Sequence, residues 1–114
     1  MSLMNKPEMI EGSVVPTAGV MTEVISVPMT AAFATLQINV TNDSENVGTI
    51  RIYRSKTDNK AMVQRSELIE AGDTIAAKGR YTNFGLLVSP GSRIYVQTSI
   101  PDLVVSATAL VQLA

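Results

Sequence analysis

The most informative part of the sequence runs Gly85-Leu86-Leu87-Val88-Ser89-Pro90-Gly91-Ser92-Arg93-Ile94-Tyr95-Val96-Gln97-Thr98. Two apolar runs flank residues 89–92. Pro90 restricts φ to about −65° and Gly91 can adopt a positive φ, which suits the central positions of a type II turn. After the turn, residues that favour burial alternate with more polar ones, which is typical of a strand with one buried face. The pattern predicts a β-hairpin over residues 84–98, at the centre of a β-sandwich.

Alternation of apolar and polar residues predicts further strands along the chain. Residues 22–27 favour a strand that Pro28 stops, and residues 103–113 form the longest alternating run. Residues 35–41 place Leu36, Ile38 and Val40 on one face. Residues 47–53 return after a polar turn, so these two segments predict a second hairpin.

The segment between residues 54 and 84 is less regular. Residues 54–60 are polar and basic, which favours an exposed loop, with an anion-binding loop as the alternative. Residues 62–63 and 74–77 predict short strands, and residues 71–73 a turn. For residues 66–70 a strand or irregular structure is favoured over one helical turn, because a single turn is marginally stable.

Turn signals recur about every 8–12 residues, a spacing typical of sandwiches and barrels. No segment has an extended apolar period of about 3.6 residues, the signature of a surface helix. The sequence therefore predicts an all-β fold, an antiparallel β-sandwich that is Ig-like or jelly-roll-like, with about seven or eight short strands.

Residues 1–20 lack clean periodicity and contain both proline and glycine. One interpretation is a frayed tail that ends in an edge strand. The other is an extended arm that orders on a neighbouring subunit, because a solvated tail has little reason to carry many apolar side chains. We expect an arm over residues 1–20 and a sandwich domain over residues 21–114. The candidate contact residues of the arm are Met9, Ile10, Val14 and Val15.

Tyr95 is the other candidate for a subunit contact, because tyrosine is common among the residues that dominate interface energetics. The alternative is a half-buried ring at a strand edge with its hydroxyl in water.

Composition argues against several classes of function. Nine Lys and Arg against ten Asp and Glu give a net charge of −1, unlike the basic excess typical of nucleic-acid-binding domains and polybasic membrane anchors. The chain has no His and no Cys, which removes the commonest general base and the commonest transition-metal ligands. No apolar run is long enough to cross a membrane, and the N-terminus lacks the apolar core of a signal peptide.

Acidic residues offer weak alternatives. Glu67, Glu70 and Asp73 are more typical of a solvated rim than of a catalytic pair. Asp43 and Glu45 lack the Asp-x-Asp-x-Asp-Gly spacing of a calcium loop. We therefore expect no enzymatic activity, no cofactor and no metal, and neither nucleic acid nor a membrane as a partner.

Four segments resemble small structural proteins of tailed bacteriophage virions. They are Ile69-Glu70-Ala71-Gly72-Asp73-Thr74-Ile75, the stretch from Gly85 to Val96, and the pair Ile38-Asn39-Val40-Thr41-Asn42 and Ile50-Arg51-Ile52-Tyr53. In that family an acidic–glycine turn precedes a Gly-Leu-x-Val-Ser-Pro-Gly turn. This chain departs at Ser92, where the family often has an acidic residue, and at residues 110–114, which lack a short acidic ending.

The resemblance implies a small Ig-like sandwich that decorates or cements a capsid, or sits in the tail apparatus, and has no active site. It implies contacts with the major capsid protein or other virion proteins, a homo-oligomer with a trimer favoured, and a virion location after assembly in the host cytoplasm. Two alternatives remain. One is a tail- or fibre-associated carbohydrate- or receptor-binding module, against which the low aromatic content and the lack of Trp count. The other is a pilus-like subunit that donates a strand.

Overall fold

Strands follow the alternation of apolar residues along most of the chain in the computed structural model, which describes residues 7–113. The strands are β1 (Pro7–Val14), β2 (Thr22–Ser26), β3 (Ala31–Asn42), β4 (Gly48–Ser55), β5 (Leu68–Ile75), β6 (Arg80–Val88), β7 (Arg93–Thr98) and β8 (Leu103–Leu113). Two short 3₁₀ helices, η2 (Lys60–Met62) and η3 (Arg65–Glu67), lie between β4 and β5.

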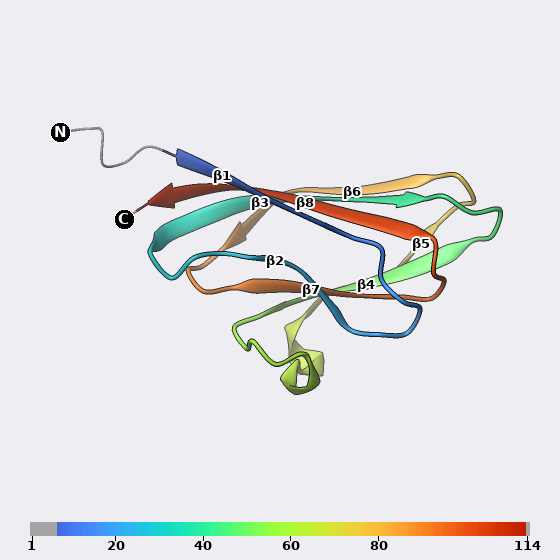
Figure 1. The fold of residues 1–114 in the computed structure, drawn as a ribbon, viewed down its shortest axis with the longest axis horizontal. Helices are drawn as coiled ribbons and strands as arrows, with labels where there is room; N and C mark the ends of the chain where they lie inside the picture. The colour runs from blue at the N-terminus through green and yellow to red at the C-terminus, as the bar shows by residue number, and fades with distance from the viewer. Residues whose placement is uncertain (1–6, 114) are drawn as a thin grey trace.

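The strands form two four-stranded sheets that pack face to face (Figure 1). Sheet 1 has the order β1-β8-β3-β6 and sheet 2 the order β2-β7-β4-β5, and each pair of neighbours is antiparallel. The predicted antiparallel sandwich is confirmed. Its strand order is that of a jelly roll rather than the Ig order, because the first strand pairs with the last and most connections cross between the sheets.

Both predicted hairpins are wrong, although their strands are present. β6 lies in sheet 1 and β7 in sheet 2, and β3 and β4 are separated in the same way. The turn between β6 and β7 forms as predicted at Gly91, which has a φ of 77°, and the Ser92 amide donates to the Ser89 carbonyl at 3.2 Å. This turn carries the chain from sheet 1 to sheet 2, so β6 and β7 lie in opposite sheets instead of side by side.

The middle of the chain also differs from expectation. Residues 60–62 form η2, capped by the Asn59 side chain, where a short strand was predicted at 62–63. Residues 71–73 lie inside β5 instead of forming a turn. Gly72, with a φ of 109°, occupies a register shift opposite Ile50 and Arg51, so the strand accommodates the glycine as a bulge. Residues 66–70 combine the end of η3 with the start of β5.

The core lies between the sheets and consists of the inward side chains of alternating positions. On β8, alternation predicted the buried face correctly from Leu103 to Val111. The largest fully buried aliphatic residues come from both sheets: Leu36, Ile38, Ile50, Ile52, Ile75, Ile94 and Leu103.

The described part of the expected arm begins with β1. It pairs with β8 along its whole length, from Pro7 opposite Gln112 to Val14 opposite Val105. β1 is therefore an edge strand of sheet 1. The division of the chain into an arm over residues 1–20 and a sandwich domain over residues 21–114 stays a prediction. Residues 1–6 of the expected arm lie outside the described residues. A role for the segment in contacts between subunits stays a prediction.

Candidate interaction surface

Two contacts between titratable side chains join neighbouring strands or edges of the sandwich, and the first involves Tyr81. The Tyr81 hydroxyl donates to the Glu70 carboxylate at 2.9 Å and links the edge strands β6 and β5. Burial raises the pKa of Tyr81, and the hydrogen bond from Asn83 opposes this shift. Within residues 7–113, no three acidic residues converge as a metal site would require. No helix there has the length and apolar character needed to cross a bilayer.

A second polar contact joins β2 to β7 on the outer face of sheet 2. Arg93 Nη1 lies 2.7 Å from Glu23 Oε1, and this hydrogen bond raises the pKa of the guanidinium. Both side chains are partly exposed, so the pair contributes little to stability.

Tyr95, a predicted contact residue, is covered by its own chain. Its side chain is 1% exposed, and its hydroxyl donates to the Thr57 carbonyl at 2.6 Å. It lies on β7 directly opposite Tyr53 of β4, beneath the loop that follows β4. Contact of this ring with a neighbour would require that loop to move. An interface role for Tyr95 stays a prediction.

Of the four candidate residues in the N-terminal segment, two face the core and two face solvent. Ile10 and Val14 are half-buried and pack against the core. Met9 is 62% exposed, and Val15 is also exposed. Met9 and Val15 are therefore the two that are free to contact another molecule.

Met9 belongs to an exposed row that crosses the outer face of sheet 1. In the pairing of β1 with β8, Met9 lies opposite Leu110. The same level of the sheet continues through Thr35 of β3, opposite Leu110, and ends at Leu87 of β6, opposite Thr35. Leu110 is 50% exposed and Leu87 62%. Phe33, two residues from Thr35 on β3, is 46% exposed. We call these four side chains, Met9, Leu110, Leu87 and Phe33, the apolar row.

The outer face around the apolar row carries little charge. The outward residues of its two central strands are all uncharged: Phe33, Thr35, Gln37, Asn39 and Thr41 on β3, and Val104, Ser106, Thr108, Leu110 and Gln112 on β8. Among the described residues, charge on this face is confined to the two edge strands: β1 carries Glu11 and β6 carries Arg80. Exposed apolar side chains on a surface depleted of charge are typical of the buried centre of a protein interface.

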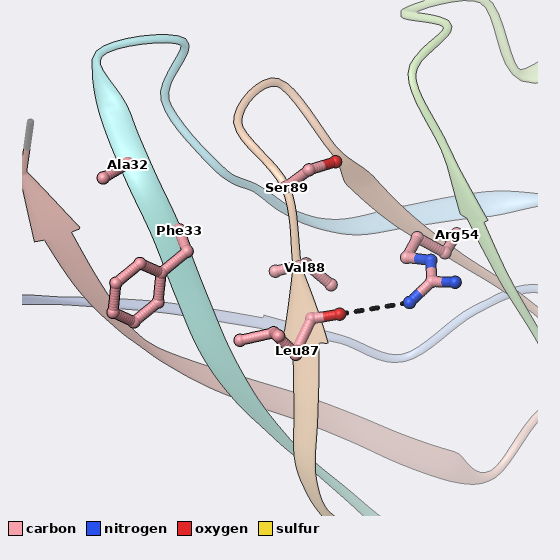
Figure 2. A pocket seen from close by; sticks show the side chains of 6 residues that line it. All are labelled: Ala32, Phe33, Arg54, Leu87, Val88 and Ser89. Atoms are coloured by element: carbon pink, nitrogen blue, oxygen red, sulfur yellow. Dashed lines mark hydrogen bonds between the residues drawn. The ribbon is translucent and has the colours of Figure 1, made fainter.

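A shallow cavity lies at the β6 end of the apolar row (Figure 2). Figure 2 shows the Leu87 side chain directed toward the Phe33 ring, while the Leu87 carbonyl oxygen points the opposite way. Arg54, from the end of β4 in sheet 2, donates to that oxygen through Nη1 at 3.1 Å. Lys56 donates to the Pro90 carbonyl at 2.8 Å on the following turn. The cavity thus has an apolar side and a cationic side.

The sequence analysis proposed Met9 as a contact residue but did not single out Phe33, Leu87 and Leu110, and it placed Arg54 in a basic loop and not beside Leu87. A signal for Phe33 was available, because it shares its face of the strand with the polar residues Thr35 and Gln37. The position of Arg54 had no such signal, because it depends on which strands become neighbours in space.

No protein-family model matches the sequence, and no curated protein matches it. Solved structures do match the fold. A chain of the cyanophage Pam1 capsid asymmetric unit is 13% identical with a TM-score of 0.53, over 96% of this chain and 86% of that one. A chain of the IBDV viral particle is 10% identical with a TM-score of 0.56, over 96% of this chain. This chain spans about a third of the IBDV chain, because only 32% of that chain is covered.

A chain from the disulfide-linked pili of Bacillus endospore appendages also has this fold. It is 9% identical with a TM-score of 0.50, over 97% of this chain and 94% of that one. At such low identities these similarities show a shared fold. The fold is thus found in chains of viral particles and of endospore appendages.

Proposed function

We propose that this chain is a bacteriophage virion structural protein that decorates or cements a capsid through contacts between subunits. The observation that carries the proposal is the charge-depleted outer face of sheet 1 with its apolar row. A protein that acted alone would have little reason to expose this surface. The fold it shares with a chain of the cyanophage Pam1 capsid supports the proposal.

The outer face of sheet 1 is large enough for a specific contact. Four strands about 4.8 Å apart, rising about 3.3 Å per residue, cover on the order of 700 Å² over the length of β8. Covering this face removes a similar area from the partner, so the contact buries on the order of 1,400 Å². Specific protein interfaces bury about 1,200–2,000 Å² in total. The partners we propose are the major capsid protein or other virion proteins, and further copies of this chain, as a trimer.

The function is tested on particles. In a lysate of the host in which the chain is produced, we expect it to sediment with virus particles at a fixed ratio to the capsid protein, and antibodies against it to label them. Finding the chain only in the soluble fraction would contradict a virion location.

The proposed surface is tested by adding purified variants to particles that lack the chain. Leu110→Glu places a charge in the apolar row, and we expect it to abolish binding to particles. Val47→Glu is the matched control, because Val47 is also exposed but lies in the connection between β3 and β4. Equal binding by both variants would contradict a role for this face.

The similarity to a pilus protein favours a second candidate, the subunit of a fibre. In that case the purified chain would form extended filaments visible by electron microscopy. Under the decoration proposal, the purified chain forms closed oligomers of defined mass and no filaments.

A further inference from the structure

We propose that copies of this chain associate head to tail in a closed ring, with the β1 edge of one copy against the β6 edge of the next. In this contact Met9 packs against Leu87 and Phe33 of the neighbour, and Glu8 pairs with the neighbour's Arg54. The ring describes how copies of this chain meet before they dock on a particle. Only its biological purpose rests on the proposed function.

The topology of sheet 1 brings these two edges together in a favourable direction. The order β1-β8-β3-β6 contains three antiparallel pairs, so β1 and β6 are opposite edges that run in opposite directions. A rotation about an axis parallel to the strands preserves strand direction. The β1 strand of a rotated copy therefore lies antiparallel to β6 of the first copy.

The register places the apolar side chains of both edges at one level. Met9 and Leu87 are the two ends of a single row across the sheet. A closed ring is generated by rotation without translation along the axis. Met9 of one copy thus reaches the next copy at the level of Leu87. Both side chains lie on the outer side of sheet 1, both are 62% exposed, and Phe33 lies beside Leu87.

The charges of the two edges are complementary on the other side of the sheet. Glu8 lies opposite Val111, whose side chain points into the core, so Glu8 leaves the edge on the side of sheet 2. Arg54 approaches Leu87 from sheet 2, which is the same side. Among the described residues, neither Glu8 nor Arg54 forms an ion pair. A second copy provides the missing partner for each.

Arg54 also explains why we expect side chains, and not backbone pairing between β1 and β6, to form this contact. Its guanidinium donates to the Leu87 carbonyl, which an added strand would need for pairing at this point of the β6 edge. A contact between two different surfaces closes only as a ring, and the smallest such ring is a trimer. The expected trimer is thus the smallest closed assembly that this contact allows, and the Arg54 bond blocks continuous pairing of β1 with β6 at Leu87.

The ion pair is tested by charge exchange, with sedimentation velocity as the measurement. We expect Glu8→Arg and Arg54→Glu each to weaken self-association about tenfold or more, and the double variant to restore it. Asp102→Arg is the matched control, because it reverses an exposed charge in the connection between β7 and β8 and should leave the mass unchanged. A wild-type chain that remains monomeric at its highest soluble concentration would overturn the proposal. So would an oligomer that both single variants leave intact.

Cysteine crosslinking tests the same contact without relying on charge, because the natural chain has no cysteine. Within one copy, β1 and β6 lie three strand spacings apart, about 14 Å, which is too far for a disulfide. We expect an equimolar mixture of Met9→Cys and Leu87→Cys to form covalent heterodimers on oxidation, and a Val47→Cys and Leu87→Cys mixture not to do so. Failure to crosslink the first pair overturns the ring, whereas the labelling of particles tests the virion role independently.

Discussion

Asn42, a buried residue at the end of β3, shows how one side chain connects two loops. Its amide donates to three carbonyl oxygens, at 2.7 Å to Asn46, 3.2 Å to Ile75 and 3.1 Å to Ala76. Its own oxygen accepts from the amide and the hydroxyl of Ser44. The β3–β4 connection is thereby joined to the end of β5. No periodicity predicts such a residue, because the sequence shows only a polar turn.

We expect Asn42→Ala to lower the free energy of unfolding by about 2–3 kcal/mol, because it removes five hydrogen bonds at a buried position, including the one that the Ser44 backbone amide donates. Urea unfolding of the purified chain measures the change. Asn39→Ala is the control, because Asn39 accepts one bond from Thr82 on the outer face and its loss costs less than about 1 kcal/mol. Equal losses in both variants would contradict the role of Asn42.

Tyr95 gives the stability of the chain a dependence on alkaline pH. Burial raises the pKa of its hydroxyl, and the nearby Glu23 raises it further. The folded chain therefore retains this proton at a pH where the unfolded chain loses it. The contribution to stability is complete below about pH 10 and is lost as pH rises through the folded pKa.

We expect Tyr95→Phe to cost about 1 kcal/mol at neutral pH, because the bond to the Thr57 carbonyl is lost. Above about pH 10 we also expect the unfolding free energy of this variant to fall less steeply with pH than that of the wild type. Part of the pH dependence remains, because the pKa of Tyr81 is raised as well. Denaturant unfolding at a series of pH values measures both effects. An unchanged slope would show that Tyr95 does not titrate differently in the two states.

At the scale of elements, the positions of the strands could be predicted from the sequence, but which strands pair with each other could not. Residues 103–113 coincide with β8, and residues 35–41 lie inside β3. Alternation identifies the buried face of a strand, and a short turn favours pairing of the strands it joins. In this fold the short turn at Gly91 instead spans the core. Pairing is decided by residues far apart in sequence, such as Pro7 and Gln112, which the local pattern does not encode.

The interaction surface was predictable to a similar extent. Met9 could be proposed from the sequence, because it is an apolar residue in a segment that was not expected to contribute to the core. Its row with Leu110 and Leu87 arises only when β1, β8, β3 and β6 align in register. The place of Arg54 beside Leu87 requires both sheets to be assembled.

Gly12 determines how closely β1 approaches β2. A Cβ atom at this position would overlap the Val24 carbonyl oxygen. We expect Gly12→Ala to destabilise the chain by about 1–3 kcal/mol, because backbone has to move to accommodate the methyl group. Amide exchange should show β1 opening more often, while Ser13→Ala, at an exposed neighbour, changes stability by no more than about 0.5 kcal/mol. Unchanged exchange in β1 would contradict this close contact.

The whole molecule is closed by the pairing of its first strand with its last. β1 adds an edge strand to β8, and its inward side chains Ile10 and Val14 pack against the core. Folding must therefore bring nearly the whole chain together before this pairing forms. Such long-range pairings make folding slow, on the scale of milliseconds to seconds.

Two truncations separate the contribution of β1 from that of the residues before it. We expect a chain that begins at Pro7 to keep the sandwich, because the β1–β8 register begins there. A chain that begins at Met21 loses β1, exposes the edge of β8 and loses about 2–4 kcal/mol from the burial of Ile10 and Val14. We expect this shorter chain to aggregate, because an unprotected edge strand pairs with other molecules. Light scattering with thermal unfolding measures both properties. If the shorter chain were a stable monomer, β1 would be an appended arm, as the sequence suggested, rather than a structural strand of the sandwich.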